Sequence, residues 1–261
     1  MKYALLHVSL PFLVCVAVAN TSLFNNVMVD LSYEHYAEQV VDSLPGFLAM
    51  PFNSIINVVL LGYVVMGLYW LFRKNSSEET KESRYVRQVF ALMAIFYAPV
   101  QWTRLATMRR APAVLDQWVT LPIFAWVSVW CSFIEGGASW RPWFALTTQL
   151  GSVLSYGLAL VHARGFEVAL GGHIVYAVHK GVRVHRLYGD HLSQRHLVLA
   201  LVSCGGFVGL KLLDHWLARY ALFQCVTGHF WSKVCDVLQF HFSFCLLTCL
   251  SERSQARQKA R

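Results

Sequence analysis

Four ionisable side chains lie in an apolar run near the C-terminus, in the stretch GHFWSKVCDVLQFH from Gly228 to His241. On a helix, His229, Lys233 and Asp236 share one face, and Lys233 and Asp236 are spaced to form an ion pair. His241 points about a third of a turn away. Such a cluster is either a site for a ligand or an ion, or a buried polar network that fixes how helices pack.

The surrounding sequence makes charged side chains costly. An ionisable group at membrane depth costs roughly 3 kcal/mol on insertion scales, so it usually faces the interior of a helical bundle and finds a partner there. Asp116 and Asp214 also lie in or beside apolar segments, and they are further candidates for the same interior network.

The composition predicts an all-α integral membrane protein. Of the 261 residues, 56% are hydrophobic and only 14% are charged, whereas a soluble domain has about 25% charged residues. Seven apolar segments are long enough to cross a hydrocarbon core of ~30 Å, so we predict one seven-helix transmembrane domain at residues 46–250. The predicted spans are residues 47–72, 88–108, 115–135, 143–162, 165–181, 196–217 and 221–250.

The N-terminal residues 1–19 fit either a signal peptide or an extra transmembrane helix. They have a basic start, an apolar centre and the A-x-A pattern of a cleavage site at Ala17 to Ala19. Residues 20–45 contain four acidic residues and no lysine or arginine, so we expect a lumenal or extracellular segment. Its sequon begins at Asn20, which we predict to be glycosylated.

The charge distribution predicts the orientation of the helices. Most lysines and arginines fall in alternate loops and in the basic tail at residues 251–261, which the positive-inside rule assigns to the cytosol. A second sequon, at Asn75, then lies in a cytosolic loop and should stay unmodified. The formal net charge of +8 is thereby explained by membrane topology, and we expect no nucleic-acid partner. The protein is expected in a membrane of the secretory pathway.

Three stretches resemble, in order, parts of the seven-helix hydrolase superfamily that contains the alkaline ceramidases, the progestin and adiponectin receptors and the Per1-like GPI-remodelling proteins. These stretches are PFNSIINVVLLGYVVMGLYWL from Pro51, LDQWVTLPIFAW from Leu115 and LKLLDHWLARYALFQCVTGHFWSK from Leu210. The resemblance implies a hydrolase-like bundle of seven helices with a lumenal start and a cytosolic tail.

In that superfamily three histidines hold a catalytic zinc ion, and a serine and an aspartate position the water that it activates. The resemblance places His229 and Asp116 at family positions, but Lys233 replaces a histidine of the family's terminal His-x-x-x-His pair. Leu105 falls where the second-helix histidine is expected, and Gln101 falls where the serine is expected. One ligand of three does not hold zinc, so we predict neither a metal nor another cofactor.

We therefore predict a non-catalytic membrane protein that binds a lipid or a membrane partner within the bilayer. The predicted binding or polar interior network consists of Asn53, Asn57, Asp116, His229, Lys233 and Asp236. One alternative is a metal-dependent hydrolase of ceramide-type or GPI-type lipids, with histidines at positions 173, 179, 185 or 191 as ligands. Another is a small transporter or channel, although the sequence has no inverted repeat and no paired Gly/Pro-broken helices.

Overall fold

The computed structural model is a bundle of long helices, and it describes residues 1–29, 31, 37, 38, 41, 43, 51–73 and 79–259. The side chains of residues 51–60, 138 and 225 lie outside this description. The long helices are α1 (Lys2–Ala19), α2 (Pro51–Phe72), α3 (Lys81–Thr107), α4 (Arg110–Gly136), α5 (Pro142–Ser155), α7 (Gly165–Tyr188), α8 (His191–Leu212) and α11 (Gly228–Lys259). The short ones are η1 (Ser22–Phe24), η4 (Gly137–Ser139), α6 (Leu158–Val161), α9 (Asp214–Leu217) and α10 (Leu222–Cys225).

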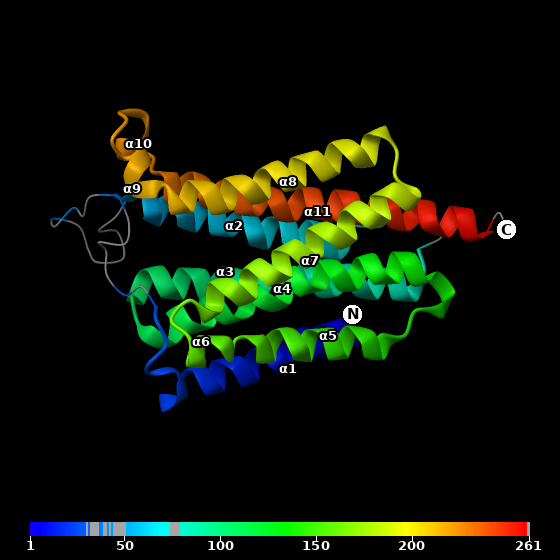
Figure 1. Cartoon of the computed structure of the whole chain (residues 1–261), viewed down its shortest axis with the longest axis horizontal. Helices are drawn as coiled ribbons and strands as arrows, with labels where there is room; N and C mark the ends of the chain where they lie inside the picture. The colour runs from blue at the N-terminus through cyan, green and yellow to red at the C-terminus, as the bar shows by residue number, and fades with distance from the viewer. Residues whose placement is uncertain are drawn as a thin grey trace.

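The long helices lie side by side and alternate in direction along the chain (Figure 1). The connections after α4 and α7 lie at the same end of the bundle as the C-terminus, and those after α1, α3 and α8 lie at the other end. Within the described residues, each predicted span lies on one long helix or on a long helix and the short helix next to it in the chain. The end that carries the C-terminus is the one predicted to face the cytosol.

Six helical stretches in the described part of the chain are long and apolar enough to cross a membrane. They are Lys2–Ala19, Lys81–Thr107, Arg110–Gly136, Pro142–Val161, His191–Leu212 and Gly228–Lys259. The prediction of an all-α membrane protein is confirmed in this coarser form, whereas the hydrolase-like arrangement of seven helices stays a prediction. The predicted span at residues 165–181 belongs to the longer helix α7, which is not among the six.

Helix α7 carries two cations that contact one carboxylate on its neighbour α4. Lys180 Nζ lies 2.5 Å from one oxygen of Glu135 on α4, and Arg183 Nε lies 2.8 Å from the other. A second polar contact, 3.1 Å between His173 and Ser155, joins α7 to α5. Lys180, Arg183 and His173 thus attach α7 to its neighbours α4 and α5.

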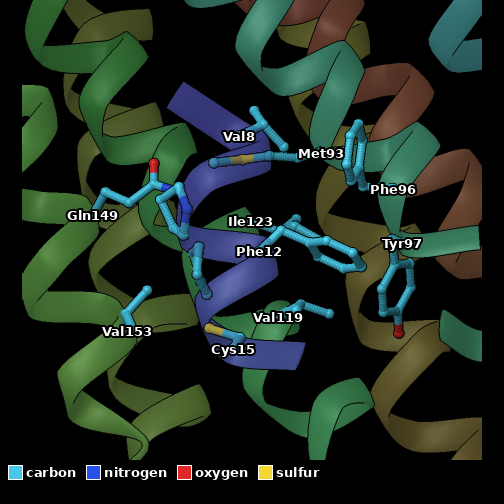
Figure 2. Close-up of a pocket in the computed structure, with 12 residues that line it drawn as sticks. Val8, Phe12, Cys15, Met93, Phe96, Tyr97, Val119, Ile123, Gln149 and Val153 are labelled. Carbon is cyan, nitrogen blue, oxygen red and sulfur yellow. The ribbon is translucent and has the colours of Figure 1, made fainter. Parts of the chain in front are cut away.

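Helix α1 is built into the bundle, where it packs against α3 and α4. Val8, Phe12 and Cys15 point from α1 toward a small cavity between α3, α4 and α5 (Figure 2). Both ring nitrogens of His7 form hydrogen bonds, one with Gln149 on α5 at 2.6 Å and one with the Tyr85 hydroxyl on α3 at 2.7 Å. Because Gln149 is itself buried, α1 supplies a hydrogen bond that the bundle interior requires.

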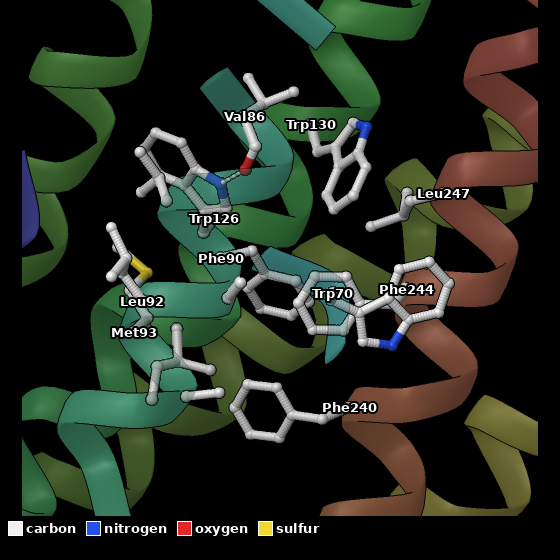
Figure 3. Packing of buried hydrophobic residues seen from close by; sticks show 14 of the residues in the cluster. Trp70, Val86, Phe90, Leu92, Met93, Trp126, Trp130, Phe240, Phe244 and Leu247 are labelled. Carbon is white, nitrogen blue, oxygen red and sulfur yellow. Dashed lines mark hydrogen bonds between the residues drawn. The ribbon is translucent and has the colours of Figure 1, made fainter. Parts of the chain in front are cut away.

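Aromatic side chains form the core between α2, α3, α4 and α11 (Figure 3). Phe244 of α11 stacks on Trp70 of α2 with ring centroids 5.0 Å apart, and it lies 4.6 Å from Phe90 of α3. The indole of Trp126 on α4 donates a 2.8 Å hydrogen bond to the carbonyl of Val86. Aromatic pairs contribute about 0.5–1.5 kcal/mol each beyond the area they bury, so this cluster holds the four helices together.

The packing of α1 predicts that residues 1–19 remain in the mature protein as a transmembrane helix. Their removal would leave Gln149 without the His7 ring and would uncover apolar surface on α3 and α4. We expect the intact mass of the purified protein to include residues 1–19. Ala19→Leu, which removes the small residue before the A-x-A cleavage point, should leave the N-terminus unchanged. A mature chain that begins at Asn20, and that becomes longer in the Ala19→Leu variant, would contradict this prediction.

Candidate functional site

The centre of the polar network is an ion pair between α3 and α4. Asp116 is 6% exposed and Arg104 is 7% exposed. The guanidinium of Arg104 donates to one carboxylate oxygen of Asp116, and the side-chain amide of Gln101 donates to the other. Gln101 and Arg104 are three residues apart on α3 and so lie on one face of that helix. Both oxygens of the buried carboxylate are therefore satisfied by α3.

A second carboxylate joins α11 to α2. The hydroxyl of Tyr63 donates to Asp236, and both side chains are buried. The Tyr63 ring meets the Tyr97 ring edge to face, with centroids 5.3 Å apart. Tyr97 accepts a 2.6 Å hydrogen bond from Gln101. The two carboxylates thus belong to one connected set of contacts that links α2, α3, α4 and α11.

Lys233 is buried near the two carboxylates, but it does not form a close ion pair with either. Its side chain is 3% exposed, and its ammonium is 6.0 Å from the centre of the Tyr97 ring and 5.9 Å from that of Phe207. No described carboxylate oxygen lies within 4.0 Å of it. Its charge nevertheless acts on both Asp116 and Asp236. Lys211 also acts on both carboxylates, so Arg104, Lys211 and Lys233 are the cations near this pair of anions.

The ion pair expected between Lys233 and Asp236 is replaced by a different arrangement. The two residues share one face of α11, as their spacing predicted, but Asp236 turns to the Tyr63 hydroxyl of the neighbouring helix α2. Asp116 likewise finds Arg104 and not Lys233 as its contacting cation. Lys233 acts on both carboxylates at longer range.

His229 lies in the first turn of α11, and Asp214, the first residue of α9, contacts it there. One oxygen of Asp214 accepts a 2.8 Å hydrogen bond from the backbone N–H of His229, and the other accepts a 3.0 Å bond from the N–H of Ala37. A carboxylate at this position satisfies an otherwise unpaired N–H and complements the helix dipole. Gly228 is required beside it, because a Cβ there would lie 2.7 Å from the carbonyl oxygen of Leu210.

The remaining sequence candidates lie elsewhere. His241 contacts Trp70 at 6.1 Å between ring centroids and Cys245 at 3.6 Å. The backbone of Asn53 and Asn57 lies in α2, but their side chains are outside the described residues. The structure therefore brings Asp116, Lys233 and Asp236 together and places His229 in the adjacent helix cap.

The residues at this site do not fit a zinc ion. Arg104 and Lys233 are among the cations that act on Asp116, so a divalent metal there would meet repulsion in place of a set of neutral or anionic ligands. Leu105, at the position of the family's histidine, packs against the apolar core. Within the described ranges, no three His, Cys, Asp or Glu side chains are grouped to hold a metal. The arrangement can fix helix positions and balance charge.

An open crevice lies beside the network, between α1, α3 and α4. Its volume is about 380 Å³, and it is lined by Phe12, Val16, Asn20, Pro99, Val100, Thr103, Ala111, Pro112 and Leu115. Pro99 has no N–H to complete the α3 hydrogen-bond pattern, and Ala111 and Pro112 have short side chains. Small side chains at the start of α4 thus leave space between the helices. Val100 and Leu115 precede Gln101 and Asp116 directly, so the network lies behind the wall of the crevice.

Comparisons with known proteins give a consistent family match. The model of the TMEM187 protein family matches residues 4–248. Transmembrane protein 187 of Homo sapiens is 54% identical over 245 residues, which cover 94% of this chain and 91% of that protein. Transmembrane protein 187 of Bos taurus is 51% identical over 251 residues, which cover 95% and 96%. No solved structure matches the chain. The resemblance to the seven-helix hydrolases is not supported by these matches and stays a prediction.

The buried ion pair predicts a characteristic pattern of stabilities. Asp116→Leu removes the carboxylate that contacts the buried Arg104 guanidinium, and we expect a loss of roughly 3–5 kcal/mol in the free energy of unfolding. Adding Arg104→Met should restore part of that loss, because the buried cation of the pair is then removed as well. Thermal melting in detergent measures both effects.

The control is Arg253→Met, which breaks the partly exposed pair with Asp190. We expect that change to leave the melting temperature almost unchanged, because solvent screens an exposed pair. An Asp116→Leu variant as stable as Arg253→Met, or a double variant less stable than Asp116→Leu alone, would contradict the interior role of the pair.

Proposed function

The chain belongs to the TMEM187 protein family, and we propose that this multi-pass membrane protein is a non-catalytic, hydrolase-like bundle that binds a lipid chain. The proposed site is the crevice between α1, α3 and α4. The observation that carries the proposal is the volume of about 380 Å³ left open along three membrane helices. A pocket of this size falls in the range that binds small molecules.

The location of the crevice favours a hydrocarbon chain as its occupant. Its walls are formed by α1, α3 and the first turns of α4, which are candidate membrane spans. Pro99 and Thr103 on its rim are exposed, and in a membrane the exposed face of a span meets lipid. Seven of the nine lining residues are apolar. A lipid tail is the molecule that the bilayer itself supplies to such a space.

The polar residues of the crevice favour a lipid from one leaflet. Asn20 and Thr103 lie near the ends of α1 and α3, at the end of the bundle predicted to face the lumen. Phe12 lies eight residues back along α1, which corresponds to a distance of about 12 Å. A headgroup near Asn20 would thus place its tail along the crevice toward the middle of the membrane. In this orientation Asn20 remains the predicted glycosylation site.

The charge network supports a binding role without catalysis. Asp116 and Asp236 both accept hydrogen bonds from protein side chains. Neither is placed to activate a water on a metal, because cations occupy the surroundings of Asp116. Under this proposal the predicted network residues stabilise the wall behind the crevice. The described geometry offers no comparable support for the alternatives of a metal-dependent hydrolase or a channel.

Filling the crevice should abolish lipid binding. We expect Ala111→Phe to reduce crosslinking of a photoactivatable phosphatidylcholine, reconstituted with the protein in nanodiscs, to peptides of α1 and α3. The melting temperature should stay close to that of the unmodified protein, because the added ring enters open space. The matched control is Val202→Phe, on a 66% exposed position of α8.

Unchanged crosslinking in Ala111→Phe, or crosslinks that map evenly over all membrane helices of the unmodified protein, would contradict the proposed site. Crosslinking to a membrane protein partner at the same peptides, with no lipid adduct, would show that the crevice binds a protein and not a lipid.

A further inference from the structure

Phe12 lies at the junction between the crevice and an inner cavity. The inner cavity has a volume of about 40 Å³ and is formed by α1, α3, α4 and α5. Phe12 lines both spaces. Figure 2 shows its ring pointing from α1 toward the side chains of Phe96 and Tyr97, with Val8 and Met93 on one side and Cys15 and Val119 on the other. Phe12 is therefore the lining residue that the two spaces share.

The ring is held in place by one aromatic contact and by its position on α1. Phe12 meets Phe96 of α3 edge to face, with centroids 5.1 Å apart. The preceding residue, Pro11, lies inside α1 and also lines the inner cavity. Proline cannot donate to the carbonyl four residues earlier, so a helix is most easily bent at this point. The ring thus sits at the most deformable part of α1.

The inner cavity is suited to the end of a hydrocarbon chain. Its walls near Phe12 are apolar, with Val8, Met93 and Ile123 among them. Of its polar lining residues, Gln149 is engaged by His7 and the Tyr97 hydroxyl by Gln101. A terminal methyl group needs no hydrogen-bond partner, whereas a polar headgroup would leave its own groups unpaired in such a space.

We propose that Phe12 determines which chain lengths the protein accepts, by closing the crevice off from the inner cavity. This inference rests on the proposed lipid-binding function. A chain no longer than the crevice ends at the Phe12 ring. A longer chain must either displace the ring or leave its last carbons in the bilayer, so it gains no further contacts with the protein.

The test compares phosphatidylcholines with two dodecanoyl or two octadecanoyl chains, as competitors of crosslinking at the crevice. In Phe12→Ala the crevice and the inner cavity become continuous. We expect the octadecanoyl lipid to compete better relative to the dodecanoyl lipid, by about threefold or more, because its additional carbons now pack against protein. Phe12→Trp should move the preference in the opposite direction. The control is Leu13→Ala, at the neighbouring position, which is exposed on the outer face of α1.

The outcomes separate the two proposals. Absence of crosslinking at the crevice in the unmodified protein would overturn the binding function itself. Crosslinking at the crevice with the same chain-length preference in Phe12→Ala, Phe12→Trp and the unmodified protein would overturn the role of Phe12 alone. Should Phe12→Ala fail to fold, the same competition is measured with Phe12→Trp and with the smaller change Phe12→Leu. The question is then decided by how strongly the octadecanoyl lipid competes relative to the dodecanoyl lipid in each variant.

Discussion

The burial of the Arg104–Asp116 ion pair is the constraint on which the arrangement of the other helices depends. A charge inside an apolar bundle is tolerated only with a partner and with its remaining hydrogen bonds satisfied. This pair fixes α3 against α4, and Gln101 completes the coordination of the carboxylate. Tyr63 and Asp236 fix α2 against α11 in the same way. The contact between Tyr63 and Tyr97 then joins the two helix pairs, so one polar network sets the packing of four helices.

The neighbouring crevice follows from the same arrangement. Once Arg104 and Asp116 hold the end of α3 against the start of α4, the short side chains of Ala111 and Pro112 meet the Pro99 region of α3 and leave space between the helices. Helix α1 closes the third side and is attached by His7 to α3 and α5. The buried ion pair and the open crevice therefore both result from the way α3 is aligned with α4.

The sequence predicted the positions of the helices because long apolar segments are unambiguous in composition. It also predicted Asp116, Lys233 and Asp236 as interior residues, since a charge in such a segment must face a partner. It did not predict their partners. Arg104 lies three residues from the end of α3 and reads as an ordinary flanking charge, whereas Tyr63 and Gln101 carry no charge at all. The choice of partner depends on how helices are aligned with one another, which periodicity within one helix does not encode. The packing of α1 likewise depends on Gln149 and Tyr85, far away in the sequence from His7.

Lys233 is coupled through its charge to two carboxylates that it does not touch, those of Asp116 and Asp236. A double-mutant cycle on melting temperature with Lys233→Met and Asp236→Asn tests this coupling most directly, because asparagine keeps the hydrogen-bonding shape of Asp236 while removing its charge. Each single change removes one member of a pair of opposite charges, so we expect each to lower the melting temperature and the double variant to recover part of the loss. Losses that add without recovery would show that the charge of Lys233 is not coupled to Asp236.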